Sequence, residues 1–69
     1  MPLNFAQPGE TVRIKKITGK QEMRQHLAEL GFVIDEQITV VSVINGNMII
    51  QVKEGRVALC KELASKIIV

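Results

Sequence analysis

An Asn-Gly pair at positions 45 and 46 constrains the fold most, because it divides a long stretch of β-branched residues into two halves. Asn-Gly is the preferred pair for a two-residue type I′ turn, which joins the two strands of a β-hairpin. We therefore predict a hairpin over residues 38–53. Such a turn also fixes the register of the strands, and it pairs Val43 with Met48, Val41 with Ile50, and Thr39 with Val52.

Both faces of this predicted hairpin carry apolar side chains. In the register given above, Ile38, Val40 and Ile49 fall on the face opposite to the paired residues. A flat sheet with one solvated face would not need apolar groups on both sides. A strand that bends through the corner of a barrel does need them, because its two halves present different faces to the core.

One helix is indicated, over Lys20 to Leu30. Met23, Leu27 and Leu30 are spaced i, i+4 and i+7, which places them on one face of a helix. Gly31 then stands where helices commonly end on a residue with a left-handed backbone. We expect a Schellman cap in which the next residue, Phe32, packs on Leu27.

Shorter elements complete the predicted fold. Residues 11–17 indicate a strand whose alternation slips by one at Ile17, and a bulge is the usual way in which a strand absorbs such a slip. Further strands are predicted at 56–60 and 67–69, with a helical turn at 61–65 between them. The sequence thus predicts a mainly β fold, a small SH3-like barrel of about five strands with one helix inserted after the first.

Length and composition limit the possible functions. The chain has 69 residues, which suffices for a single domain, 1–69, and its only cysteine rules out an internal disulfide. A net charge of only +2 and only two aromatic residues argue against nucleic-acid binding, which uses basic grooves and stacked aromatic side chains. No apolar run is long enough to span a bilayer, and no signal peptide is visible.

The order of these features resembles the FeoA family along nearly the whole chain. The resemblance is carried by the following residues: Pro8-Gly9-Glu10, Gly19, Arg24, Leu27, Leu30-Gly31-Phe32, the hairpin glycine, Val57-Ala58-Leu59, Ala64 and the ending 67–69. Most are glycines and apolar residues, so they report the fold rather than a chemistry. The chain has Ile34-Asp35 where the family carries Pro-Gly, so that loop is expected to differ in shape.

The resemblance implies a function. Members of the FeoA family are cytoplasmic helpers of FeoB-type ferrous iron transporters, whose cytosolic part is a GTP-binding domain. The resemblance therefore implies an accessory protein of ferrous iron transport that binds this cytosolic part, and that meets the membrane only through the transporter. The alternative is a small nucleic-acid-binding or metal-sensing barrel domain.

Catalysis is not predicted. The chain has no Gly-rich phosphate loop and no nucleophile and base close together in sequence. Cys60 and His26 are each the only residue of their type, and a dyad of the two stays open as an alternative. For Cys60 we favour a buried position as a small hydrophobe.

A weak metal-binding candidate lies on the predicted helix. Glu22, His26 and Glu29 are spaced i, i+4 and i+7, and an imidazole with two carboxylates suits a divalent transition metal such as Fe²⁺. Charged residues at a helix edge are ordinary solvated groups, and we favour that interpretation. No tightly bound cofactor is expected.

The predicted partner-binding surface is the helix edge with the turn that follows it. It consists of Lys20, Arg24, His26, Leu30 and Phe32. A helix beside a barrel forms a groove, and Arg and aromatic side chains are favoured at interface hot spots. The alternative is that Met23, Leu30 and Phe32 are simply core residues.

Overall fold

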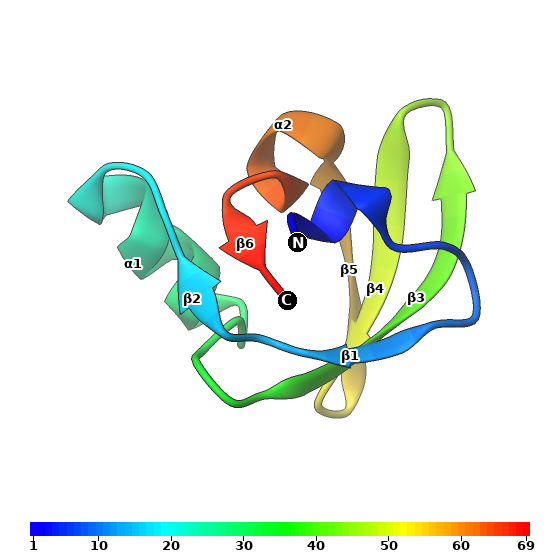
Figure 1. Ribbon diagram of the computed structural model, residues 1–69, viewed down its shortest axis with the longest axis horizontal. Helices are drawn as coiled ribbons and strands as arrows, with labels where there is room; N and C mark the ends of the chain where they lie inside the picture. The colour runs from blue at the N-terminus through cyan, green and yellow to red at the C-terminus, as the bar shows by residue number, and fades with distance from the viewer.

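The larger of two β-sheets contains four strands in the order β1-β3-β4-β5 (Figure 1). These are β1 (Thr11–Arg13), β3 (Gln37–Ile44), β4 (Asn47–Val52) and β5 (Gly55–Cys60). All neighbouring strands run antiparallel. The computed structural model describes every residue of the chain, 1–69.

The smaller sheet joins β2 (Lys16–Ile17) to β6 (Ile67–Ile68), again antiparallel. Pro2 extends this sheet by an isolated bridge to Ile68. Next to the bridge, the Val69 N–H donates to the Met1 carbonyl oxygen at 2.7 Å, and the Met1 amine donates to the Val69 carbonyl oxygen at 2.9 Å. The two ends of the chain therefore lie side by side, close to the centre of the view in Figure 1.

The two sheets wrap around one core, so the prediction of a mainly β barrel is confirmed. The single long helix, α1 (Gln21–Glu29), follows β2, as predicted. Two one-turn elements accompany it: a 3₁₀ helix η1 (Leu3–Phe5) near the start of the chain, and α2 (Lys61–Ala64) between β5 and β6. There are six short strands rather than five, because the predicted first strand is divided between the two sheets.

That division occurs at Ile14, whose side chain is fully buried. The Ile14 N–H donates to the Glu36 carbonyl oxygen at 3.0 Å, and its own carbonyl accepts from the Asp35 N–H at 2.7 Å. One residue later, the Lys15 N–H donates to the Ile68 carbonyl oxygen at 2.7 Å. The chain thus leaves the neighbourhood of β3 and joins β6, and this change of sheet explains the slip in the alternation.

The β3–β4 turn has the predicted geometry. Asn45 and Gly46 have φ angles of 49° and 80°, and a type I′ turn requires positive φ at both central residues. Val43 lies opposite Met48 as predicted.

The rest of the predicted register is wrong. A β-bulge at Val41 shifts the pairing by one residue, so that Ile50 lies opposite Val40, and Val52 lies opposite Ile38. A bulge inserts one residue into one strand of a pair and bends it. As a result Ile38 and Val40 point into the core together with their partners on β4. This explains why both faces of the predicted hairpin carry apolar residues.

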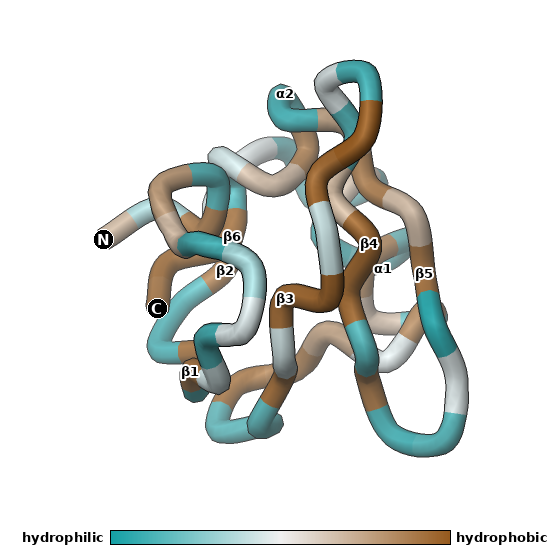
Figure 2. Tube along the Cα trace, turned by 90° about the vertical axis from the view of Figure 1, so that its right-hand side faces the viewer, coloured by the Kyte–Doolittle hydropathy of each residue, from teal (hydrophilic) through white to brown (hydrophobic).

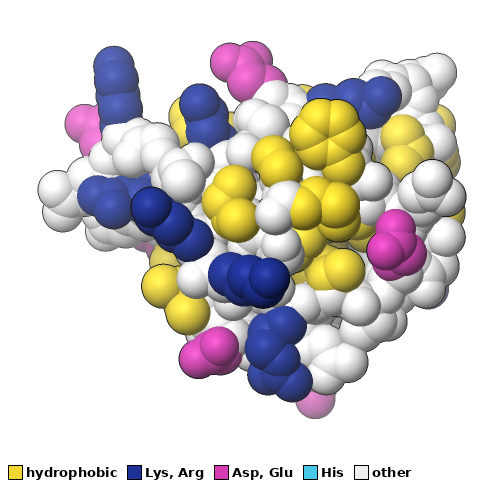
Figure 3. Space-filling view, viewed as in Figure 1, with side chains coloured by type: hydrophobic (Ala, Val, Ile, Leu, Met, Phe, Trp, Pro, Cys, Tyr) yellow, Lys and Arg dark blue, Asp and Glu magenta, His cyan; other side chains and the backbone are white.

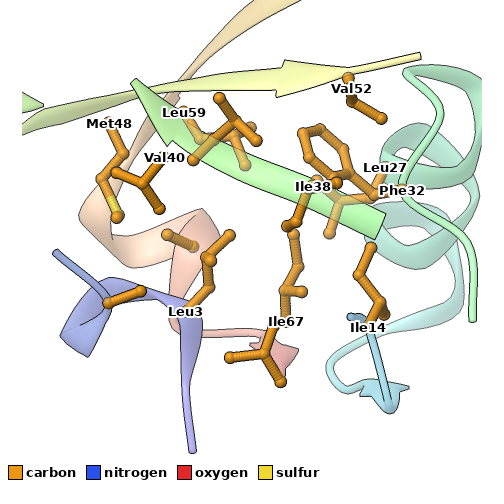
Figure 4. Packing of buried hydrophobic residues seen from close by; sticks show 14 residues of the cluster. Leu3, Ile14, Leu27, Phe32, Ile38, Val40, Met48, Val52, Leu59 and Ile67 are labelled. Carbon is orange, nitrogen blue, oxygen red and sulfur yellow. The ribbon is translucent and has the colours of Figure 1, made fainter. Parts of the chain in front are cut away.

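The core consists of buried apolar side chains from every part of the chain. Figure 4 shows them converging from η1, β3, β4, β6 and the C-terminal end of α1, and Figure 2 shows the hydrophobic residues concentrated along β3, β4 and β5. No polar or charged residue is buried. The members are Leu3, Ala6, Ile14, Leu27, Phe32, Ile38, Val40, Met48, Ile50, Val52, Leu59, Ala64, Ile67 and Val69.

Candidate partner-binding site

Helix α1 contacts the barrel through a narrow apolar stripe. Leu27 is fully buried, and Met23 and Leu30 pack against the core from half-buried positions. Every other residue of the helix is exposed. A nine-residue helix is too short to be stable alone in water, so this stripe and the helix end must hold it in place. The remaining surface of the helix is free to meet a partner.

The helix ends in the predicted Schellman cap. The Phe32 N–H donates to the Leu27 carbonyl oxygen at 2.9 Å, and the Gly31 N–H donates to the Ala28 carbonyl oxygen at 3.0 Å. These two bonds define the motif. They also fix the direction in which the chain leaves the helix toward β3.

Gly31 is required at this position for two reasons. Its φ of 105° is a backbone conformation that residues with a side chain rarely adopt. In addition, a Cβ atom placed there would lie only 3.2 Å from Cγ2 of Val52. The turn after α1 therefore lies close to Val52 of β4, with little room for a side chain at Gly31.

Phe32 was predicted to belong to the partner-binding surface, and the structure contradicts this. Its side chain has no exposed area, and it lies in the core beside Leu27 and Ile38 (Figure 4). The Schellman cap turns the chain inward immediately after Gly31, and the aromatic ring follows. Phe32 is therefore a core residue that supports the helix.

The other predicted residues are accessible, but they lie on two different edges of the helix. Lys20, Arg24 and His26 are exposed, and Leu30 is half-buried. Consecutive residues are about 100° apart around a helix, so Arg24 and His26 point roughly 200° apart. Lys20 and Arg24 share one edge, whereas His26 and Leu30 share the other, and the buried stripe lies between the edges.

The two edges differ in charge. The Lys20 and Arg24 edge is basic. The His26 edge also carries Glu22 and Glu29, which lie within one helical turn of His26 on the same side. Charges of both signs are therefore available to a partner, at separate places on α1.

The candidate metal ligands lie on the His26 edge. Glu22, His26 and Glu29 are all exposed. No group of three or more His, Cys, Asp or Glu side chains lies close enough in this structure to hold a metal ion.

Cys60 is exposed, contrary to its predicted burial. It is the last residue of β5, and its neighbour Leu59 takes the core position instead. Side chains alternate between the two faces of a strand, so only one of these two residues points inward. The thiol is therefore open to solvent.

Phe5 was not predicted as a contact residue, yet it has 66% of its surface exposed. It is the last residue of η1, whose Leu3 is fully buried. The available signal was an aromatic residue in a short N-terminal segment that has no predicted strand or helix to bury it.

The fold defines a class of protein: a small barrel of short strands with one exposed helix on its surface. A family model described as "FeoA domain" matches residues 1–69. The chain therefore belongs to the FeoA domain family.

Individual relatives agree with this assignment. The chain is 38% identical over 68 residues to a protein of Methanocaldococcus jannaschii that is named for Fe(2+) transport, covering 99% of this chain and 83% of the relative. A crystal structure of an "Iron Uptake Regulatory Protein (FeoA)" superposes with a TM-score of 0.88 at 32% identity, covering 96% of this chain and 88% of that one.

The fold class is also confirmed. The FeoA of Stenotrophomonas maltophilia, described as an SH3 domain protein, superposes with a TM-score of 0.85. At 22% identity, over 99% of this chain and 87% of that one, this likeness shows the fold alone. None of the helices in the present structure is both long and apolar enough to cross a membrane.

Proposed function

We propose that this chain is a cytoplasmic accessory protein of a ferrous iron transport system, and that it acts by binding the cytosolic part of a FeoB-type transporter. The observation that carries the proposal is the match to the FeoA domain over residues 1–69. The relative at 38% identity, which is named for Fe(2+) transport, supports the same process.

A binding role fits the way in which α1 is held. The helix rests on the barrel through three side chains and presents all its other residues to solvent. An exposed helix on a rigid support is a common way to recognise a groove in another protein. Such a role requires no catalytic group on this chain.

The proposed docking surface comprises Lys20, Arg24, His26 and Leu30. Arg is favoured at interface hot spots, since its guanidinium group forms several hydrogen bonds and also packs well. The two helix edges face different directions, so a partner that contacts both Arg24 and His26 has to straddle α1. On docking, the chain changes the conformation or the nucleotide cycle of the transporter's GTP-binding domain.

Charge reversal on the helix tests this surface. Isothermal titration calorimetry measures the binding of the chain to the purified cytosolic domain of a FeoB-type transporter. We expect Arg24→Glu to weaken binding about tenfold or more, because an arginine contact at the centre of an interface contributes at least 1–2 kcal/mol. The matched control is Arg56→Glu, which makes the same charge change at an exposed position of β5.

His26→Ala examines the second edge. If both Arg24→Glu and His26→Ala weaken binding, the partner straddles the helix; if only one does, the contact lies on that edge. Circular dichroism confirms that each variant is folded. Unchanged binding of both folded variants contradicts the proposed surface, and no binding of the unmodified chain contradicts the proposed partner.

A further inference from the structure

A second surface, distinct from α1, is formed where the first residues of the chain meet β2 and β6. We call it the β6 face. Its apolar centre consists of Met1, Pro2, Phe5 and Ile68, and its basic rim consists of Lys15, Lys16 and Lys66. None of these seven residues belongs to the proposed docking helix.

Strand pairing shows which side chains lie together at the centre of the β6 face. Lys16 lies directly opposite Ile68 in the β2–β6 ladder, and Pro2 lies opposite Ile68 on its other side. Directly paired residues point to the same face of a sheet, so these three side chains form a row. The neighbouring Ile67 points the other way and is fully buried, which shows that the row faces outward.

Two large apolar side chains stand beside this row in open solvent. Phe5 has 66% and Met1 has 52% of its surface exposed. The Phe5 N–H donates to the Pro2 carbonyl oxygen at 3.1 Å, and the fully buried Leu3 anchors the turn between them. The aromatic ring is thus held outward by a fixed turn.

Basic residues lie beside the apolar centre. The backbone of Lys15 is hydrogen-bonded to Ile68, and the Lys66 carbonyl oxygen accepts from both the Thr18 N–H at 2.7 Å and the Thr18 Oγ at 3.1 Å. These bonds fix both lysines next to β6. Figure 3 shows hydrophobic side chains gathered on this face, with Lys and Arg mainly to their left and below them, and an acidic side chain at their right-hand edge.

We propose that the β6 face binds the surface of an anionic phospholipid leaflet, with Phe5 and Met1 entering the headgroup region. Apolar side chains within a ring of Lys are the combination that holds proteins at anionic interfaces. Lysine suits the rim, because its aliphatic stem lies along apolar surface while its ammonium group reaches the phosphates. The inference rests on the proposed function only for the location of the chain, because an accessory protein of a membrane transporter works beside such a leaflet.

Nucleic acid fits the face less well. It would satisfy the lysines, but single-stranded nucleic acid is held by stacking on aromatic side chains, and Phe5 is the only aromatic residue here. Met1, Pro2 and Ile68 would remain without an apolar partner. An acidic protein segment is the other possible occupant, and the experiment has to distinguish it from a lipid surface.

Co-sedimentation with protein-free vesicles tests the proposal on the full chain. We expect binding to vesicles of equal parts phosphatidylcholine and phosphatidylglycerol at low salt, and no binding to phosphatidylcholine alone. Raising the salt to about 0.5 M shortens the Debye length to roughly 4 Å and should abolish binding. No binding to the anionic vesicles at low salt overturns the proposal, and so does equal binding to both vesicle types.

Matched variants then locate the contact. Lys16→Ala should weaken binding about fivefold, whereas Arg56→Gln, which removes the same charge from β5 on the far side of the molecule (Figure 2), should not. Phe5→Ala should weaken binding about tenfold, whereas Ile34→Ala, at a side chain that is 61% exposed in the loop before β3, should leave it unchanged. Equal losses in each test variant and its control would contradict the β6 face.

The vesicles contain no transporter, so this result is independent of the proposed function. A chain that binds the transporter domain in solution but ignores anionic vesicles would refute only the lipid proposal. A third outcome is that the chain binds the soluble domain but not the vesicles, and that Phe5→Ala weakens binding to the domain. This outcome would assign the β6 face to a protein partner and would overturn the lipid proposal.

Discussion

Replacing Gly31 by alanine probes the junction between α1 and the barrel. Gly31 follows α1 with a φ of 105°, and a Cβ atom there would lie 3.2 Å from Cγ2 of Val52. Gly9 provides a matched control, because its φ is 93° and a Cβ atom there would have no neighbour within 4 Å. The two substitutions share the backbone strain and differ in the contact.

The structure gives the expected magnitudes. Forcing a residue with a side chain into this backbone region costs roughly 1–2 kcal/mol, and this is the whole expected effect of Gly9→Ala. Gly31→Ala adds about 1 kcal/mol for the crowding against Val52, so its total is about 2–3 kcal/mol. A domain of this size has roughly 3–10 kcal/mol of stability, so Gly31→Ala removes a large share of it.

Urea unfolding followed by far-ultraviolet circular dichroism measures the difference. The chain has no Trp or Tyr, so intrinsic fluorescence offers little signal. In a thermal scan followed by the same signal, we expect the midpoint to fall by about 10–20 °C for Gly31→Ala, and by about half as much for Gly9→Ala.

Combining Gly31→Ala with Val52→Ala tests the contact itself. Residues in contact give non-additive changes in stability, so the free-energy cost of Gly31→Ala should shrink when the valine methyl groups are absent. Equal destabilisation by Gly31→Ala and Gly9→Ala, together with an additive double variant, would refute the close approach of α1 to β4.

Three further predictions follow from burial and exposure. Phe32→Ala should lower the free energy of unfolding by about 3–5 kcal/mol and leave much of the chain unfolded at 37 °C by circular dichroism; a small loss would contradict its core position. Cys60→Ser should change stability by less than about 0.5 kcal/mol, and the native thiol should react readily with iodoacetamide, whereas a protected thiol would contradict its exposure. Titration with zinc or ferrous ions should give no saturable micromolar shifts in the amide spectrum, and such shifts centred on Glu22, His26 and Glu29 would contradict this.

The elements that depend on local chemistry could be predicted from the sequence. The turn at Asn45, the stop at Gly31 and the apolar stripe of α1 each follow from residues that are close together in the chain. Their signals do not depend on where other segments lie, and the structure contains all three.

The elements that depend on distant contacts could not be predicted in the same way. The bulge at Val41 carries no residue signal, and it is placed by the need to direct Ile38 and Val40 into the core. Likewise, Cys60 is exposed because the pairing of β5 assigns the core position to Leu59. Both outcomes depend on pairing partners that are remote in sequence.

The candidate partner-binding site shows the same limit. Exposure of Arg24 and His26 followed from the helical pattern, but the inward path of Phe32 depends on the position of the barrel under the helix. The β6 face requires that the two ends of the chain lie together, and no local pattern contains that information.

The most direct test of the proposed function is an amide spectrum of the isotopically labelled chain, recorded with and without the unlabelled cytosolic domain of a FeoB-type transporter. The proposed function predicts saturable shifts or line broadening that cluster on residues 20–30, at both edges of α1 or at one of them. An unchanged spectrum at high micromolar concentrations of the domain would contradict the partner, and changes confined to β5 and the β3–β4 turn would contradict the docking helix.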